Sequence, residues 1–441
     1  MSASSPTLAP GTARRPLVAL PAALLAPARL RECLECGQIQ TIPAMPTAAR
    51  AICVRCGGVL RHTHYDPLGV PLALNLAALT ALVIGAAATL MAVSTAGRSH
   101  AADLFSGPSG LERDGFWELA AVVLFTTFAA PLAKLLATTI VLLSLCHPNP
   151  PAGVRTLFAW VRYLRPWSMV EVYMLGVFVA YVRLGEVVRI ELGPAVYALA
   201  ALMVLMTAAE FTLDAQAVWE AMDLAGVPRP LRRLPRDRGV GLRRLGCDTC
   251  GLVSRTIPGT ACRRCGTPVY HRKPNSISRT WALGIATMIL YLPANLYPVL
   301  SATRLGANRT STILGGVQEL LALGMWPLAA VVFFASIAVP VLKLAGLGVL
   351  LVTTQTGQTG WLRDRAILYR IVDSIGRWSM IDIFMASLLV ALLQFGSVVS
   401  VVPGAGAVCF TAVVILTMLA AQTFDPRLMW DAADVQADRA P

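Results

Sequence analysis

Long apolar segments alternate with shorter polar segments along most of the chain. A helix needs about 20 mainly apolar residues to cross the hydrocarbon core of a bilayer. Segments of this kind predict eight membrane-spanning helices, at about 68–94, 116–146, 167–185, 193–213, 279–302, 325–352, 378–397 and 403–423. The expected fold is therefore an all-α polytopic membrane protein.

The two halves of the chain resemble each other. Identical residues recur 209 positions apart, as in Trp117 and Trp326, Pro131 and Pro340, and Lys134 and Lys343. After a two-residue insertion the spacing becomes 211, which aligns W-S-M-V-E-V-Y-M (Trp167 to Met174) with W-S-M-I-D-I-F-M (Trp378 to Met385). Because each half holds an even number of predicted spans, both have the same orientation. The sequence thus predicts two tandem parallel repeats and not an inverted repeat.

Composition agrees with a membrane location, because 56% of the 441 residues are hydrophobic and only 14% are charged. The start of the chain differs from the rest, being rich in alanine and proline up to residue 30. A secretory signal peptide would place its apolar stretch directly after a basic start. We therefore predict a disordered N-terminal tail over residues 1–30.

Eight of the ten cysteines form four C-x-x-C pairs in two groups. The first group is Cys33, Cys36, Cys53 and Cys56, and the second is Cys247, Cys250, Cys262 and Cys265. Two such knuckles can bring four thiolates to tetrahedral corners around one Zn2+. Glycine directly follows the second cysteine of every pair, as Gly37, Gly57, Gly251 and Gly266, and glycine tolerates the positive φ of a tight turn. Two structural zinc ribbons are predicted; disulfides and a rubredoxin-like iron or redox site are the alternatives.

These patterns divide the chain into seven parts. We expect the tail (1–30), zinc ribbon 1 (31–66), a four-helix transmembrane unit (67–215), a basic linker (216–245), zinc ribbon 2 (246–273), a second four-helix unit (274–424) and a C-terminal tail (425–441). Each repeat is thus a small ribbon followed by four membrane helices.

Basic residues are distributed unevenly between the two sides of the predicted spans. Residues 1–67 hold seven Arg and the linker 214–278 holds twelve Lys and Arg, whereas the four intervening loops, which include 95–115 and 303–324, together hold five. By the positive-inside rule, both ribbons and both termini are expected to face the cytoplasm. A reducing compartment also suits metal-binding thiols. The net charge of +13 is then an orientation signal, and no nucleic-acid partner is expected.

Polar side chains inside the apolar segments form a candidate network. Lys134 and Lys343 lie well inside apolar runs, and Glu171 and Asp382 lie near the start of the third span of each half. An ionisable group at membrane depth costs at least about 2.5–3.5 kcal/mol, so it faces a partner or a wet cavity. We expect Lys134 to pair with Glu171, and Lys343 with Asp382.

Three interpretations of these four residues stay open. In the first, they form ion pairs that specify the fold. In the second, they have a functional role as a polar gate, a lipid-headgroup contact or a proton relay. In the third, their side chains extend to the membrane interface. The other candidates for the network are Ser168, Ser379 and Asn295, the last of which lies between two prolines.

Taken together, several motifs resemble the paraquat-inducible protein A family of Gram-negative inner-membrane proteins. These motifs are the paired four-cysteine ribbons, Y-L-P-A-N-L-Y-P (Tyr291 to Pro298), a P-x-x-K helix and R-W-S-M-x-D-x-F (Arg377 to Phe384). The resemblance implies a periplasmic partner of the mammalian-cell-entry (MCE) type, and phospholipids carried between the inner and outer membranes. In the first half, Ile84, Ala86 and Thr89 replace Pro293, Asn295 and Pro298. We therefore expect the C-terminal half to hold the more open cavity.

Three functions are compatible with these observations. The first is a non-enzymatic inner-membrane component that loads or receives lipids for the periplasmic partner. The second is a membrane redox or metal sensor, and the third is a proton-coupled small-molecule transporter. Neither a P-loop nor H-E-x-x-H occurs, and no serine–histidine–aspartate constellation is evident, so an enzyme is not expected.

Overall fold

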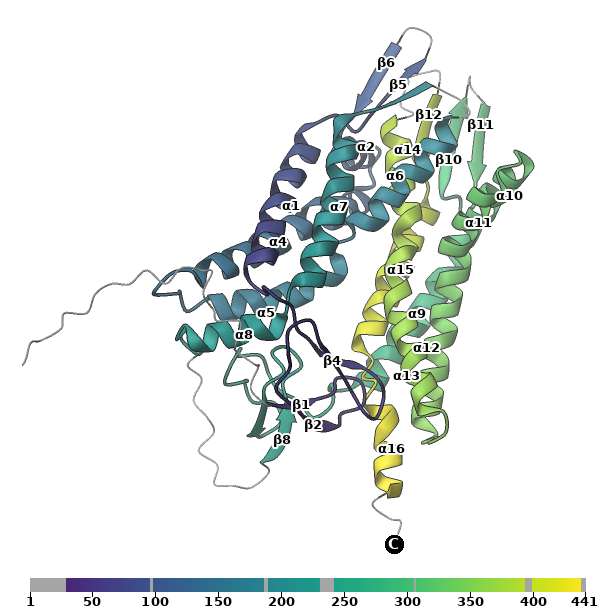
Figure 1. The fold of residues 1–441 in the computed structure, drawn as a ribbon. Coiled ribbons are helices and arrows are strands. Elements are labelled where there is room, and N and C mark those ends of the chain that lie inside the picture. Colours follow the sequence, from purple (N-terminus) through teal and green to yellow (C-terminus); the bar gives the residue numbers. More distant parts are fainter. Residues whose placement is uncertain are drawn as a thin grey trace, which may run out of the picture.

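The structure, a computed structural model, describes residues 29–95, 98–185, 189–230, 242–304, 307–392 and 399–437. Helices form two groups that stand side by side, and small sheets lie at both ends of them (Figure 1). The predicted disordered tail lies almost entirely outside the described residues. The chain is mostly helical, as expected.

The first half is built on four main helical segments. They are α1 (Gly69–Ala87), α3 with α4 (Trp117–Leu124 and Ala130–Ser144), α6 (Val170–Gly185) and α7 (Pro194–Thr212). Shorter helices accompany them: α2 (Ser106–Arg113), α5 (Val154–Leu164) and α8 (Ala215–Leu224). Helix α8 occupies the beginning of the segment predicted as a basic linker.

The second half has the same order of elements. Its main segments are α9 (Ser276–Leu296), α11 with α12 (Trp326–Phe333 and Val339–Gln355), α14 (Ile381–Leu392) and α15 (Ala405–Thr423), and its shorter helices are α10 (Ile313–Ala322), α13 (Leu362–Ile375) and α16 (Leu428–Ala437). The predicted C-terminal tail therefore contains helix α16.

A π-helical turn interrupts the same helix in each half. The turns are Phe125–Ala129 and Phe334–Ala338. One residue separates each turn from the proline that follows it, Pro131 or Pro340. Proline has no amide hydrogen, and its ring clashes with the carbonyl group four residues earlier. The wider turn accommodates that clash without ending the helix.

Six helical segments of the described chain are long and apolar enough to cross a membrane. They are Gly69–Ala87, Trp117–Ser144, Pro194–Thr212, Trp326–Gln355, Leu362–Leu392 and Ala405–Val435. Six of the eight predicted spans coincide with or overlap these segments. The other two form α6, which has 16 residues, and α9, which contains Pro293.

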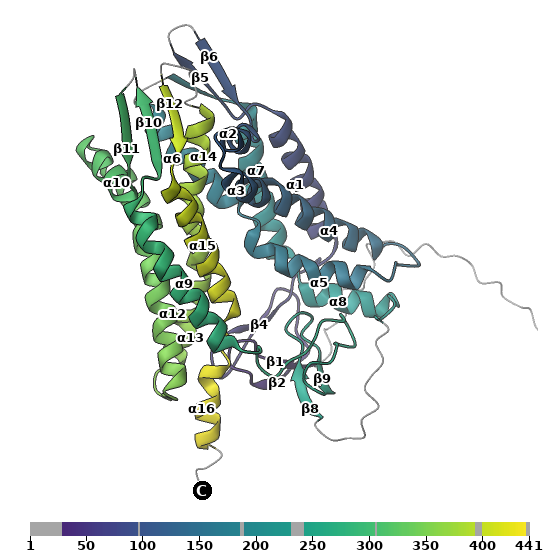
Figure 2. The same cartoon turned by 180° about the vertical axis from the view of Figure 1, so that it is seen from behind.

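Two three-stranded antiparallel sheets correct the prediction of an all-α fold. One contains β5 (Met91–Thr95), β6 (Arg98–Ala102) and β7 (Arg189–Leu192) in the order β6-β5-β7; the other contains β10 (Leu300–Arg304), β11 (Ala307–Ser311) and β12 (Val399–Pro403) in the order β11-β10-β12. Both lie at the end of the molecule opposite the ribbons (Figures 1 and 2). Strands β5 and β10 follow the first helix of each half so closely that their apolar residues resemble its continuation.

The two cysteine ribbons lie together at the other end. Ribbon 1 contains β1 (Arg29–Glu32), β2 (Ile39–Ile42), β3 (Arg50–Ile52) and β4 (Val59–His62), and ribbon 2 contains β8 (Arg243–Gly246) and β9 (Val253–Thr256). Each ribbon packs on the helices of the opposite half. Cysteines of ribbon 1 share a buried cluster with Leu350, Phe424 and Trp430, and those of ribbon 2 share one with Leu142, Phe158 and Trp219. We call this arrangement crossed packing.

Helix α14 forms the centre of the helical core. Every one of its residues from Ile381 to Leu392 is buried. Where α14 meets α6, Phe384 contacts Tyr173 edge to face at 5.6 Å between ring centroids. A Cβ on Gly176 would lie only 3.1 Å from the Phe384 Cβ, so glycine permits this close approach. The two halves therefore pack directly on each other through α6 and α14.

Candidate functional site

The four cysteine knuckles have the same backbone geometry. In each, a glycine amide donates a hydrogen bond to the carbonyl oxygen of the first cysteine, at 2.8 Å for Gly37 and Gly251 and 2.9 Å for Gly57 and Gly266. All four glycines have positive φ, between 67° and 80°. The turn conformation expected from the position of the glycines is therefore confirmed.

Each group of four thiols converges on one point. The closest sulfur atoms are 3.5 Å apart, in the pairs Cys33–Cys56, Cys36–Cys53, Cys247–Cys265 and Cys250–Cys262. All four ligand atoms of a group lie within 4.8 Å of one another. A disulfide bond would require about 2.05 Å, whereas four sulfurs each about 2.3 Å from a tetrahedral ion lie about 3.8 Å apart. Two metal sites, one in each ribbon, fit this geometry.

The electrostatics of the thiols also favour a cation. Hydrogen bonds from Cys36 and Cys56 lower the pKa of the Cys33 thiol to about 4. The hydrogen bond to Cys33 raises the pKa of Cys36, because a second negative charge beside the first is unfavourable. A cluster of buried thiols thus ionises readily once, and a divalent cation would supply the charge that stabilises further thiolates.

Hydrogen bonds around the sulfur atoms orient the ligands. The amides of Gly58 and Arg264 donate to Cys56 Sγ and Cys262 Sγ, both at 3.4 Å. In ribbon 2 the Thr267 hydroxyl also lies 2.9 Å from Cys265 Sγ. Donors of this kind stabilise metal-bound thiolates and fix their direction.

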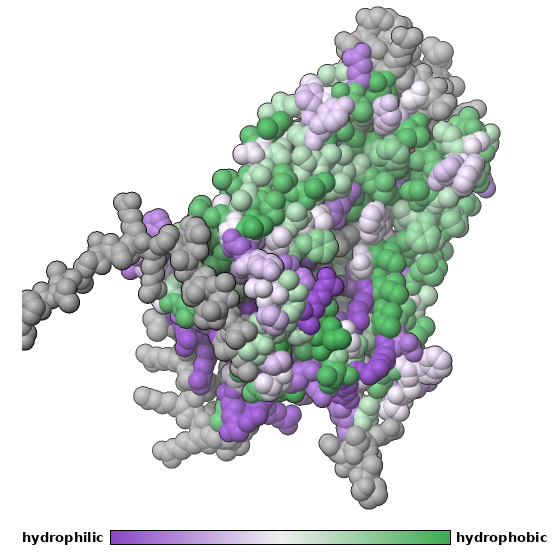
Figure 3. Space-filling view, in the orientation of Figure 1, coloured by the Kyte–Doolittle hydropathy of each residue, from purple (hydrophilic) through white to green (hydrophobic). Residues whose placement is uncertain are grey.

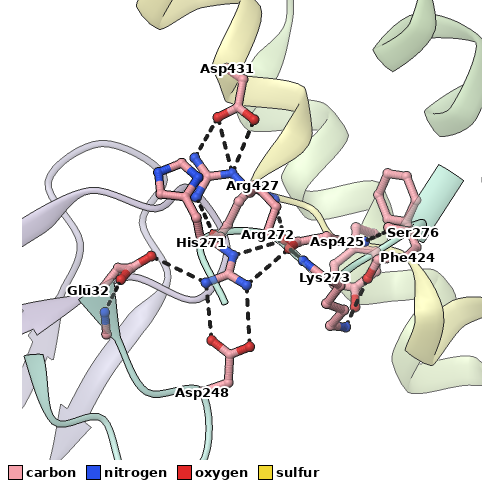
Figure 4. A network of polar contacts seen from close by, with 12 residues as sticks. Glu32, Asp248, His271, Arg272, Lys273, Ser276, Phe424, Asp425, Arg427 and Asp431 are labelled. Carbon is pink, nitrogen blue, oxygen red and sulfur yellow. Dashed lines mark hydrogen bonds and ion pairs between the residues drawn. The ribbon is translucent and has the colours of Figure 1, made fainter. Parts of the chain in front are cut away.

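A buried arginine joins both ribbons to the end of the last membrane helix (Figure 4). The guanidinium of Arg427, 2% exposed, contacts Asp425 at 2.9 Å, Asp248 of ribbon 2 at 3.1 Å and Glu32 of ribbon 1 at 3.2 Å. Burial raises the pKa of Glu32, while the nearby positive charge of Arg427 opposes that effect. Arg427 was not among the residues predicted from the sequence, since the matching residue of the first half is Gln216.

The predicted partner of Lys134 was wrong. Lys134 forms its ion pair with Glu210 on α7, and Arg165 contacts the same carboxylate at 3.1 Å. Glu171 instead accepts a hydrogen bond from the Thr207 hydroxyl at 3.3 Å. Because Glu210 has no acidic counterpart in the second half, where Ala421 occupies the matching position, a search guided by the repeat did not find it.

The predicted pair of Lys343 and Asp382 is not formed either. Lys343 is 2% exposed, and its Nζ atom has no hydrogen-bond partner among the residues that the structure describes. The ammonium lies close to the backbone of Gly376, where a Cβ would be 2.4 Å from Nζ. Asp382 lines a separate small cavity of about 50 Å³ beside β10 and α10. The two side chains therefore belong to different surroundings.

The remaining residues of the predicted network are also buried or capped locally. The hydroxyl oxygens of Ser168 and Ser379 are buried and have no hydrogen-bond partner within the described ranges. Asn295 donates to the Tyr291 carbonyl oxygen at 2.8 Å, within its own helix. Within the described residues, no hydrogen bond joins any of these three residues to Lys134 or Lys343.

The larger of the two cavities that we describe lies beside the first half, contrary to expectation. Its volume is about 490 Å³, and it opens between the helices of the first half and both ribbons. Lys134, Leu135, Phe158 and Met206 line the helical side, while Arg31 and Thr249 line the ribbon side. Crossed packing creates this space, because it places ribbon 1 across the end of both halves.

Comparison with known proteins identifies relatives along nearly the whole chain. The sequence model of the paraquat-inducible protein A family matches residues 68–223 and 277–434. The chain is 33% identical over 402 residues to the intermembrane transport protein PqiA of Escherichia coli (strain K12), covering 90% of this chain and 95% of the relative.

Two further relatives are more distant. The lipophilic envelope-spanning tunnel protein A of Escherichia coli (strain K12) is 29% identical over 91% of each chain. A probable intermembrane transport protein of Haemophilus influenzae is 24% identical over 92% of this chain and 97% of the relative. No solved structure matches. With six candidate membrane spans and a family match over most of its length, the chain is a multi-pass membrane protein of the paraquat-inducible protein A family.

Proposed function

We propose that the protein is an inner-membrane component of a system that carries lipids between the membranes of a Gram-negative envelope. It loads phospholipids onto, or receives them from, a periplasmic MCE-type partner, and it catalyses no chemical conversion. The observation that carries this proposal is the likeness over nine tenths of the chain to proteins named for intermembrane transport. The mixed polar and apolar cavity beside the membrane helices agrees with an amphipathic cargo.

In cells, loss of the protein is expected to slow the exchange of phospholipid between the two membranes. Pulse-labelling of lipids, followed by separation of inner and outer membranes, measures that exchange in a deletion strain and in the complemented strain. Unchanged exchange, in a strain whose other lipid-transport systems have been removed, would contradict the proposal. A defect confined to the response to oxidants would favour a redox sensor instead.

The orientation forms part of the proposal. Both ribbons and both termini face the cytoplasm, and the two sheets face the periplasm, where they would meet the partner. The tandem units are parallel repeats related by an approximate twofold axis along the membrane normal. Hydrophilic residues gather over the ribbon end of the molecule while apolar residues cover the helices (Figure 3), which supports this orientation together with the excess of arginine on that side.

Cysteine labelling is expected to distinguish the two ends. A cysteine at Leu323, 68% exposed near the sheets, should react with an impermeant reagent in intact cells. A cysteine at Tyr65, 85% exposed after ribbon 1, should react only in broken cells. Both are made in a background with Cys146 and Cys409 replaced by serine. Labelling of position 65 alone in intact cells would reverse the assigned orientation.

Both ribbons are proposed to hold structural zinc. Elemental analysis of the purified protein is expected to find two equivalents of zinc per chain. The double variant Cys53→Ser with Cys56→Ser should retain about one, because ribbon 2 keeps its four thiolates. The control variant Cys146→Ser with Cys409→Ser should retain both, since neither residue belongs to a ribbon. Iron in place of zinc would contradict the assignment.

In the second half, Lys343, Asp382, Ser379 and Asn295 are proposed to act in the passage of lipid or in a coupled proton movement. The burial of Lys343, Asp382 and Ser379 supports this proposal, because polar groups at membrane depth are costly to keep without a role. Lys134, Glu171 and Ser168 are the corresponding residues of the first half.

A further inference from the structure

A buried arginine that contacts no carboxylate directly within the described residues lines the larger cavity. Arg31 lies on strand β1 of ribbon 1, and only 5% of it is exposed. Its Nη1 atom lies over the first knuckle turn of ribbon 2, where a Cβ on Gly251 would be 1.9 Å away. Among the residues that the structure describes, no carboxylate lies in direct contact with Arg31, although the charges of Glu220 and Asp214 act on it from farther away. The side chain is nevertheless part of the cavity wall.

The acidic residues of the cavity are already held by other cations. Arg427 binds Glu32 and Asp248, Arg370 binds Glu35, and Lys134 with Arg165 binds Glu210. Nearby outside the cavity, Arg61 binds both Asp214 and Glu220. Within the described residues Arg31 is thus a buried cation that shares distant carboxylates with Arg61 and has no direct ion pair, a condition that proteins seldom tolerate.

The ribbon fold itself does not require a cation at this position. Leu245 on strand β8 is the counterpart of Arg31, because each residue precedes the first cysteine of its ribbon by two positions. Leu245 is 1% exposed and packs in the apolar cluster of ribbon 2. An apolar side chain therefore satisfies the same site in one ribbon, so the arginine in the other has a different role.

The walls of the cavity are amphipathic. Leu135, Phe158 and Met206 of the membrane-helix side supply apolar walls to the cavity that Arg31 also lines. Gln216 lines the same space, and its Oε1 atom is buried without a hydrogen-bond partner within the described part of the chain. A volume of about 490 Å³ falls within the range of about 300–1,000 Å³ that is usual for small-ligand sites.

We propose that this cavity binds the phosphate group of a phospholipid, with Arg31 as the phosphate ligand and the apolar wall against the glycerol and upper acyl segments. The planar guanidinium presents paired donors that match phosphate oxygens. Gln216 Oε1 would accept a hydrogen bond from an amine or hydroxyl of the headgroup. This inference rests on the proposed function, since it names the cytoplasmic-side site at which the cargo is held.

Binding of fluorescent phosphatidylglycerol and phosphatidylethanolamine to the full-length protein in mixed micelles tests this site. The variant Arg31→Leu reproduces the residue of ribbon 2, and Arg31→Gln serves as a second neutral variant. Arg50→Leu is the control, because Arg50 is an exposed arginine of ribbon 1 that does not line the cavity. We expect at least tenfold weaker lipid binding in both Arg31 variants, with two equivalents of metal and an unchanged or higher Tm.

Three results would overturn the proposal. The first is lipid binding by both Arg31 variants that equals that of Arg50→Leu. The second is loss of metal or a lower Tm with unchanged lipid binding, which would make Arg31 a countercharge for the thiolates of ribbon 2. The third is full displacement of lipid by millimolar inorganic phosphate, which would assign the site to a free phosphate-bearing solute.

The same variants separate the site from the wider function. If both Arg31 variants bind lipid normally while lipid exchange in cells depends on the protein, the assignment of the lipid site to this cavity is wrong and the proposed transport function stands. If lipid exchange in cells does not depend on the protein, the transport function fails whatever the binding experiment shows.

Discussion

Replacement of Arg427 by alanine is expected to lower the free energy of unfolding by about 3–5 kcal/mol, the usual cost of removing one member of a buried ion network. The side chains of Asp425 and Glu32 are only 1% and 6% exposed, and the variant removes the cation that both of them contact. Because Arg427 connects both ribbons to the end of α15, we expect the ribbons to separate from the helices before the helices unfold.

Thermal unfolding of the purified protein, combined with limited proteolysis, measures this effect. The control is Arg229→Ala, since Arg229 is 67% exposed and lies 3.9 Å from its nearest carboxylate oxygen, on Asp223. Exposed pairs of this kind contribute about 0–1 kcal/mol. If Arg427→Ala has the Tm and the protease resistance of Arg229→Ala, the network does not hold the ribbons in place.

Replacement of Lys343 by methionine is expected to reduce lipid exchange strongly while membrane abundance stays normal or rises. Lys343 is a buried ammonium with no hydrogen-bond partner in the described chain, so an apolar residue of similar length removes a desolvation cost. If the ammonium interacts with cargo or a moving proton, its loss removes a charged hydrogen bond of about 1.5–3 kcal/mol, or about 10- to 100-fold in rate.

Lys134→Met is the matched variant in the first half. It leaves Glu210 with only Arg165, so it should lower abundance, whereas Lys343→Met should not. The double variant Lys343→Met with Asp382→Leu adds a second comparison. Wild-type abundance and wild-type lipid exchange in the double variant would mean that the two residues are purely structural; wild-type abundance with impaired exchange would support a gate or relay. Wild-type exchange in well-expressed Lys343→Met would contradict any functional role for Lys343.

The two four-cysteine clusters could be predicted from the sequence because their geometry is local. Each knuckle needs two cysteines at a fixed spacing and a glycine at the turn, and the positive φ of Gly37 and Gly266 agrees with that requirement. Most of the membrane helices could be predicted for the same reason, since length and apolar composition are properties of one segment.

The contacts between distant segments could not be predicted. Crossed packing depends on contacts between segments that are far apart in the chain, and no local pattern in either ribbon indicates the half on which it packs. Glu210 was missed because it interrupts the symmetry between the halves, while Arg427 was missed because it lies beyond the last span. Strands β5 and β10 were missed since their pairing with β7 and β12 involves residues about 100 positions away.

Gentle purification from native membranes, followed by mass spectrometry of bound lipids and proteins, tests the central claim most directly. The account predicts that phospholipid and a periplasmic MCE-type protein co-purify with the wild-type chain, well above their levels with an unrelated inner-membrane protein of similar span number. Recovery of the intact, metal-loaded protein with neither lipid nor such a partner enriched would contradict it.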